Sequence, residues 1–160
     1  MDTRHPDIPE RLNQISEQII GCAIEVHRTL GPGLSERLCE EAMLHELALR
    51  NIEVARQVAV AVRYKGVDLH GQRLDLVVEG AVIVELKAVE AVADVHPAQL
   101  LTYLRVAHLP LGLFINFHVP LLTKGVYRRI NSQAFDRSAS HQVLVSVASA
   151  ASSRPLRSDR

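Results

Sequence analysis

The sequence predicts an α/β fold in which helices flank a mixed central sheet. Apolar residues first recur at steps of three and four, the period of a helix, and later alternate at the period of a strand. The resulting order of two helices, three strands, a helix and further short strands is typical of one mixed sheet with flanking helices. At 160 residues, 48% hydrophobic and 22% charged, the chain can form one domain with its own core.

Two helices are expected near the start of the chain. The apolar positions of residues 9–30 fall on one stripe, and Gly31-Pro32-Gly33 is a typical helix stop. A second helix is predicted for residues 34–50. The break between the two helices should bring Glu36 close to the end of the first helix, near His27.

The sheet should begin with a half-buried strand at residues 57–64, where apolar and polar residues alternate strictly before a turn at Lys65-Gly66. The remaining elements are predicted as strands at 73–78 and 81–88, a helix at 96–107, and strands at 111–117 and 126–130.

Charged residues interrupt two of these apolar runs. Asp75 lies within Leu74–Val78, and Glu85 and Lys87 lie within Val82–Ala88. An unpaired charge in such a position costs several kcal/mol, so each is expected to have a partner. Two carboxylates and an ammonium are the groups that metal-assisted phosphodiester hydrolysis requires. Taken singly, each residue also fits a structural role, as a strand-end carboxylate or a surface ion pair.

The length of the connection after Val78 decides whether these groups meet. A two-residue loop would pair Asp75 with Val84 and place Asp75 and Glu85 on opposite faces of the sheet. A three-residue loop, Glu79 to Ala81, would pair Asp75 with Glu85 and put Lys87 on the same face. The metal-site hypothesis therefore requires the three-residue connection or an equivalent bulge.

These motifs resemble those of the PD-(D/E)XK nuclease superfamily. Leu74-Asp75 stands where the name has Pro-Asp, and Glu85-Leu86-Lys87 is similar to the E-x-K element. Gln99-Leu-Leu-Thr-Tyr103 resembles the Q-x-x-x-Y motif of the RecB-like branch. The resemblance runs from about residue 12 to residue 131 and implies a restriction-endonuclease-like fold, with a nuclease-like domain over residues 9–131.

A closer resemblance is to the bacterial GxxExxY protein family, which is placed in that superfamily. The naming motif is similar to Gly33-Leu-Ser-Glu36-Arg-Leu-Cys39, with cysteine where the family has tyrosine. Any role of that tyrosine is therefore absent here, although the metal site does not require it.

The resemblance implies roles for the residues that match its motifs. Glu36, Asp75 and Glu85 would hold Mg²⁺ or Mn²⁺ through their oxygens, with Glu40 as the rival of Glu36. Lys87 would act beside the attacked phosphate. The expected catalytic set consists of Asp75, Glu85, Lys87, Gln99 and Tyr103. His27 is expected to be a satisfied interior histidine rather than a ligand, and His96 and His108 are weaker candidates still.

Nucleic acid, DNA before RNA, is the expected partner. A homodimer is compatible with the resemblance, since small nucleases of this superfamily often pair to cut two strands. The 18 basic and 18 acidic residues balance, which counts mildly against a dedicated nucleic-acid binder. The alternatives are a catalytically inactive nuclease-fold module with a binding or regulatory role, a structural ion-pair cluster, and a hydrolase of another phosphate ester.

The composition also predicts the chain's surroundings. The first 20 residues hold six charges and no apolar segment of a signal peptide, and no run is long enough to span a membrane. A cytoplasmic protein is expected, with Cys22 and Cys39 as reduced, buried thiols. Residues 132–160, rich in Ser, Ala and Arg, are expected to form a partly disordered C-terminal tail.

Overall fold

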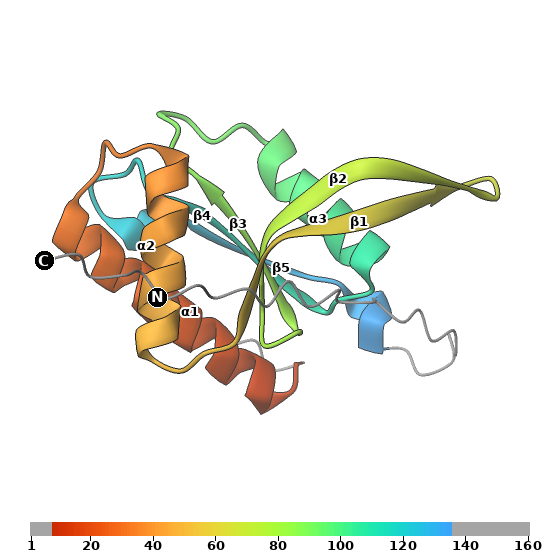
Figure 1. Cartoon of the computed structure of the whole chain (residues 1–160), viewed down its shortest axis with the longest axis horizontal. Helices are drawn as coiled ribbons and strands as arrows, with labels where there is room; N and C mark the ends of the chain where they lie inside the picture. Colours follow the sequence, from red (N-terminus) through yellow and green to blue (C-terminus); the bar gives the residue numbers. More distant parts are fainter. Residues whose placement is uncertain (1–7, 136–160) are drawn as a thin grey trace, which may run out of the picture.

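The computed structural model describes residues 8–135 (Figure 1). The predicted tail is described only at Ser132–Phe135, and its remainder, residues 136–160, lies outside the described range. Among the described helices, none combines the length and the apolar character needed to cross a membrane. The elements in chain order are α1 (Glu10–Leu30), α2 (Glu36–Leu49), β1 (Val54–Tyr64), β2 (Val67–Val78), β3 (Val82–Lys87), α3 (Val95–Ala107), β4 (Leu111–Asn116), the 3-10 helix η1 (Leu122–Lys124), β5 (Val126–Ile130) and the 3-10 helix η2 (Ser132–Phe135).

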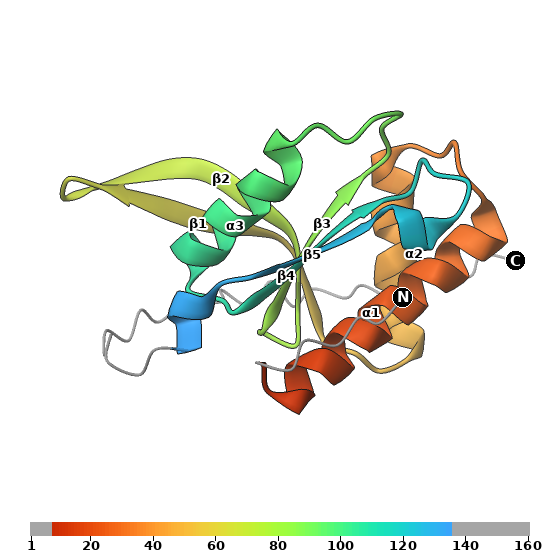
Figure 2. The ribbon, with the colours of Figure 1, turned by 180° about the vertical axis from the view of Figure 1, so that it is seen from behind.

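The five strands form one mixed sheet that follows the chain, in the order β1-β2-β3-β4-β5. Only β3 and β4 are parallel, and α3 makes the crossover between them. One apolar cluster joins α1 and α2 to one face of the sheet, and a second joins α3 to the other face. Figures 1 and 2 show these helices on the two sides. The predicted α/β fold with a mixed, helix-flanked sheet is confirmed.

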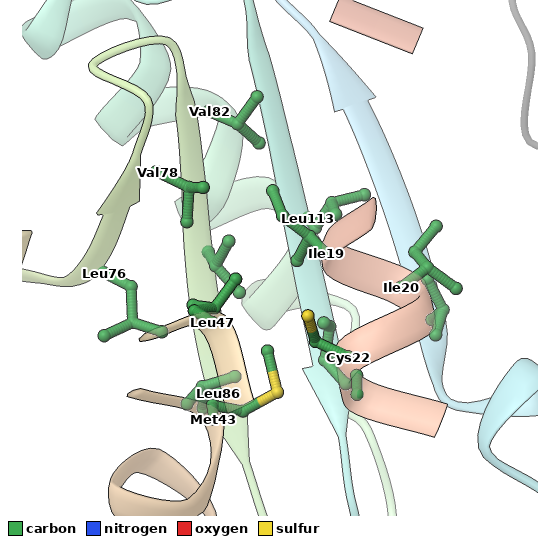
Figure 3. Close-up of a cluster of buried hydrophobic side chains, with 14 of the residues drawn as sticks. Ile19, Ile20, Cys22, Met43, Leu47, Leu76, Val78, Val82, Leu86 and Leu113 are labelled. Carbon is green, nitrogen blue, oxygen red and sulfur yellow. The ribbon is translucent and has the colours of Figure 1, made fainter. Parts of the chain in front are cut away.

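The larger cluster forms because α1 and α2 each present one apolar stripe to the sheet. Figure 3 shows Ile19 and Cys22 of α1 and Met43 and Leu47 of α2 gathered against the strands that carry Leu86 and other apolar residues. All five side chains are fully buried. Cys22 and Cys39 are free, buried thiols, as the sequence predicts.

The connection between β2 and β3 has the length that the metal-site hypothesis requires. Val78 pairs with Val82, so the loop contains three residues, and the Ala81 N–H donates to the Val78 carbonyl at 3.0 Å. Glu79 and Gly80 both take positive φ, 52° and 60°. A left-handed conformation is costly for Glu79 and easy for Gly80. The three-residue length confirms the prediction for the loop, and Asp75 and Glu85 follow directly after the last pair of the ladder, Leu76 with Val84.

Strand β2 changes the face that it buries at Asp75. Residues two apart on a strand normally share a face, yet Leu74 packs in the α3 cluster and Leu76 packs in the α1–α2 cluster. The partner strand is irregular at the same level. The β1–β2 pairing passes from Arg56 to Val58 without Gln57, whose φ is 49°. Asp75 therefore lies where the hairpin twists sharply, beside the left-handed residue Gln57. Strained backbone of this kind is often found at functional sites.

The β1–β2 hairpin extends farther than the sequence predicts. Strand β1 begins at Val54 rather than at residue 57, and β2 begins at Val67 rather than at residue 73. β3 pairs only with residues 76–78 of β2, so the outer part of the hairpin is a two-stranded ribbon. Residues 67–72 contain only a short apolar alternation, Val67 and Leu69, which ends at Gly71, and the pattern-based prediction missed them.

Candidate active site

The centre of the candidate site is a pair of carboxylates on neighbouring strands. The Asp75 backbone N–H lies 3.4 Å from Glu85 Oε1, and Asp75 Oδ2 accepts a hydrogen bond from the Leu86 N–H at 2.9 Å. Each carboxylate is thus held by the backbone of the strand opposite. The register after Val78 places the two acidic residues next to the last pair of the ladder, Leu76 with Val84.

Glu85 is strongly perturbed by this arrangement. The residue is only 9% exposed, and burial together with the negative charge of Asp75 raises the pKa of its carboxyl to about 8. The Asp75 N–H and the charge of Lys87 oppose the rise without cancelling it. The Glu85 carboxyl therefore holds its proton to a higher pH than an ordinary carboxyl does, and a bound cation would favour its release.

Lys87 lies two residues beyond Glu85 and so on the same face of β3. Its Nζ donates to Glu36 Oε1 at 3.1 Å. Partial burial alone lowers the pKa of Lys87. The hydrogen bond and charge of Glu36, helped by Asp75 and Glu85, outweigh burial and raise the pKa overall. The lysine is therefore a firmly charged ammonium at the end of β3.

The structure distinguishes Glu36 from its rival Glu40. Glu36 lies in the first turn of α2, after an N-cap at Ser35, and its side chain is 45% exposed. Glu40 is buried one turn later, where it accepts hydrogen bonds from Arg56 and Gln57, both at 2.8 Å. Only Glu36 reaches Lys87. The position of α2 against the sheet gives the contact with Lys87 to Glu36, and the sequence does not reveal that position.

Helix α3 presents Tyr103 and Gln99 to the site. The Tyr103 hydroxyl accepts hydrogen bonds from Gln99 and, at 2.7 Å, from Gln72 of β2. Burial and the nearby charge of Glu85 raise the pKa of Tyr103, and the hydrogen bond from Gln99 partly offsets them. Tyr103 is thus close enough to the carboxylates to sense their charge. Gln72 is a residue that sequence reasoning missed, because nothing in its local pattern marks it.

His96 also contributes to this side of α3. His96, Gln99 and Tyr103 follow the i, i+3, i+7 spacing of one helix face. The His96 ring stacks on Phe114 with centroids 5.6 Å apart, and Phe114 is the β4 neighbour of Glu85. Its Nδ1 atom is buried without a hydrogen-bond partner in the described part of the chain. The sequence alone gave His96 little weight.

Two other predicted positions lie in structural roles. His27 Nε2 is 2.8 Å from the Val119 carbonyl, so this histidine is satisfied as expected. Cys39, where the GxxExxY motif has tyrosine, packs in the α1–α2 core, and burial raises the pKa of its thiol. Its side chain supports the fold of α2 rather than the site.

The oxygen donors present are suited to a hard divalent cation. Within residues 8–135, no three His, Cys, Asp or Glu side chains converge as a metal-binding group, and Glu36 forms an ion pair with Lys87. Mg²⁺ commonly uses one or two protein carboxylates and keeps several waters, so three are not required. Asp75 and Glu85 supply such a pair, and a cation beside them would offset both the burial of the Glu85 charge and its repulsion by Asp75, the two causes that raise the Glu85 pKa.

A mixed sheet that carries Asp, Glu and Lys at the junction of two paired strands defines a nuclease-like domain. A family model described as the PD-(D/E)XK nuclease superfamily matches residues 13–130. The chain belongs to this superfamily, and its fold is of the restriction-endonuclease-like type. A search of curated proteins found no match.

Proposed function

We propose that this protein is a metal-dependent nuclease that hydrolyses phosphodiester bonds of DNA. The observation that carries the proposal is the pairing of Asp75 with Glu85 across β2 and β3, with Lys87 following on the same face. Membership of a nuclease superfamily supports the same chemistry. Mg²⁺ or Mn²⁺ is the proposed cofactor, because both donors are carboxylates.

In the proposed mechanism, Asp75 and Glu85 would hold the cation, which when bound would supply an activated water and offset charge on the phosphate. Lys87 places a positive charge where negative charge develops on the phosphoryl oxygens. Glu36 orients the lysine and keeps it protonated by its hydrogen bond. Gln72, Gln99 and Tyr103 form a hydrogen-bonded wall beside the carboxylates and position substrate or the water next to them.

The alternative is a nuclease-fold module that binds without cutting. Cysteine at position 39, where the GxxExxY motif has tyrosine, favours it. The zero net charge points the same way. The two functions differ in the behaviour of the wild type, because a module that binds without cutting shows no metal-dependent cleavage.

The test is cleavage of single-stranded, duplex and branched DNA and of RNA, each with Mg²⁺ and with Mn²⁺. Wild type should cut in a metal-dependent way, and Asp75→Ala and Lys87→Ala should lose cutting while keeping their melting temperatures. Lys124→Ala, an exposed lysine in η1, is the matched control and should cut as wild type does. Normal cutting by Lys87→Ala would refute the mechanism. No metal-dependent cutting by wild type, with no Mn²⁺-induced shift in its melting temperature, would favour the binding module.

A further inference from the structure

The outer end of the β1–β2 hairpin, residues 61–73, forms an arm that extends away from the body of the protein. Figures 1 and 2 show the turn of this hairpin as an outlying tip beyond α3. Eleven of its residues are exposed and only Val62 and Gln72 are partly covered. An isolated two-stranded hairpin is at best marginally stable in water, so this length of bare ribbon indicates a binding partner.

The arm has one apolar face and a basic character. Cross-strand pairs place Val62 opposite Leu69 and Tyr64 opposite Val67 on one face. Tyr64, Val67 and Leu69 are 58%, 60% and 49% exposed. The arm also carries three basic residues (Arg63, Lys65, Arg73) and one acidic residue, Asp68, for a net charge of +2. Because the whole chain is neutral, the rest of it carries −2, and the arm is a local basic feature.

A second copy of the chain is a poor occupant for this face. A stable protein–protein interface uses roughly 20–30 residues from each partner. The apolar face of the arm offers four side chains. The net positive charge of the arm instead favours a polyanion. Part of that charge lies at the tip of the arm, where the Lys65 ammonium is 5.4 Å from the centre of the Tyr64 ring.

The arm joins the candidate site directly. Gln72, at its base, donates to the Tyr103 hydroxyl, and Asp75 follows two residues after Arg73 on the same strand. A polyanion that lies along the arm therefore passes the carboxylates. The major groove of B-DNA is about 12 Å wide and accepts a two-stranded ribbon, whereas the major groove of duplex RNA is too narrow for side chains to read.

We propose that the arm of residues 61–73 inserts into the major groove of duplex DNA and holds the duplex against the site at Asp75 and Glu85. The proposal rests on the proposed nuclease function and adds the form of its substrate. Arg63 and Lys65 contact phosphates on the groove walls, and the apolar face contacts base edges such as thymine methyl groups. Asp68 pairs with Arg63 at 3.2 Å in an exposed ion pair, which a phosphate can replace at little cost.

The geometry sets a minimum duplex length. Val67 and Asp75 are eight residues apart on β2, which corresponds to about 26 Å at about 3.3 Å per residue. That span equals about eight base pairs at about 3.4 Å each. A duplex that extends fewer base pairs than this beyond the cut should not reach the tip of the arm.

The experiment compares Arg63→Glu/Lys65→Glu with a matched control, Arg11→Glu/Lys124→Glu, whose two cations are exposed and lie outside the arm. Both are made in the Asp75→Ala background, so that DNA is bound and not cut. Fluorescence anisotropy measures Kd for a 24-base-pair DNA, a 6-base-pair DNA, single-stranded DNA and duplex RNA. The arm variant should bind the long DNA about tenfold more weakly, with a salt slope reduced by about two. The control, the short DNA, the single strand and the RNA should show no such difference.

Unchanged affinity in the arm variant, or equal losses on duplex RNA, would overturn the proposal. Size-exclusion chromatography with light scattering tests the other occupant: a wild-type dimer that the arm variant converts to a monomer would assign the arm to a second copy and also overturn it. Cleavage by the Asp75→Ala protein would instead refute the proposed active site and leave the result on the arm standing. A wild type that binds no duplex at all would overturn both.

Discussion

Replacing Glu85 with glutamine should make the metal-free protein more stable above neutral pH. Glu85 is buried beside Asp75, and its pKa rises from an ordinary 4.5 to about 8. Glutamine keeps the shape of the side chain and removes its charge. The variant therefore tests whether burial and repulsion by Asp75 disfavour the charged form of Glu85 in the folded protein.

The direction in which stability changes with pH follows from the number of protons that the folded and unfolded states bind. Between pH 4.5 and about 8, the folded protein holds a proton on Glu85 that the unfolded chain has released, so stability falls as pH rises through this window. One pKa unit corresponds to about 1.4 kcal/mol, so the full loss has an upper limit on the order of 4–5 kcal/mol. For a chain of this size, 1 kcal/mol changes Tm by about 2–4 °C. Glu85→Gln should therefore melt above wild type by up to about 20 °C at pH 8.5 and close to it at pH 4.5.

Thermal unfolding of both proteins from pH 4.5 to 9 in EDTA measures this difference, with Glu41→Gln, an exposed residue of α2, as the control. Added Mn²⁺ should raise the Tm of wild type at pH 8.5 and leave Glu85→Gln nearly unchanged, because a cation relieves the same repulsion. Parallel curves for wild type and Glu85→Gln across the whole pH range would refute the reasoning.

Three further predictions concern packing and the site. Gly112→Ala should destabilise the fold by about 1–3 kcal/mol in urea unfolding, because its Cβ would lie 2.7 Å from the buried Leu100 side chain; stability equal to wild type would contradict this close packing. Met43→Ala should lose about 2–5 kcal/mol in the same assay, since the fully buried side chain would leave a cavity, and a loss under 1 kcal/mol would contradict it. Tyr103→Phe should lose about 1 kcal/mol and lower the cleavage rate, because Gln72 would lose its acceptor; an unchanged cleavage rate would remove Tyr103 from the site.

Much of the fold could be predicted because its elements carry strong local patterns. The stripe of α1 and the apolar runs of β3 and β4 are visible in a single pass along the chain, and the elements lie close to the predicted ranges. The demand that Asp75 face Glu85 also came from local information, namely the period of a strand and the length of one loop. The register after Val78 satisfies it.

The features of the site that the sequence did not predict depend on contacts between distant parts of the chain. Gln72 and Tyr103 are 31 residues apart, and only the docking of α3 on the hairpin brings them together. The preference for Glu36 over Glu40 at Lys87 follows from the rotation of α2, which its sequence does not specify. The positive φ of Gln57 had no signal either, since left-handed positions are usually inferred from glycine or asparagine.

The contacts of helix α1 with the last part of the described chain affect the order in which the protein folds during synthesis. Arg128 of β5 donates to Asn13 of α1 at 2.7 Å, across 115 residues of chain, and His27 contacts Val119 across 92. The strands, by contrast, pair with their neighbours in sequence. Helix α1 therefore leaves the ribosome first but completes its contacts last. The apolar stripe of α1 stays partly exposed until β5 has emerged.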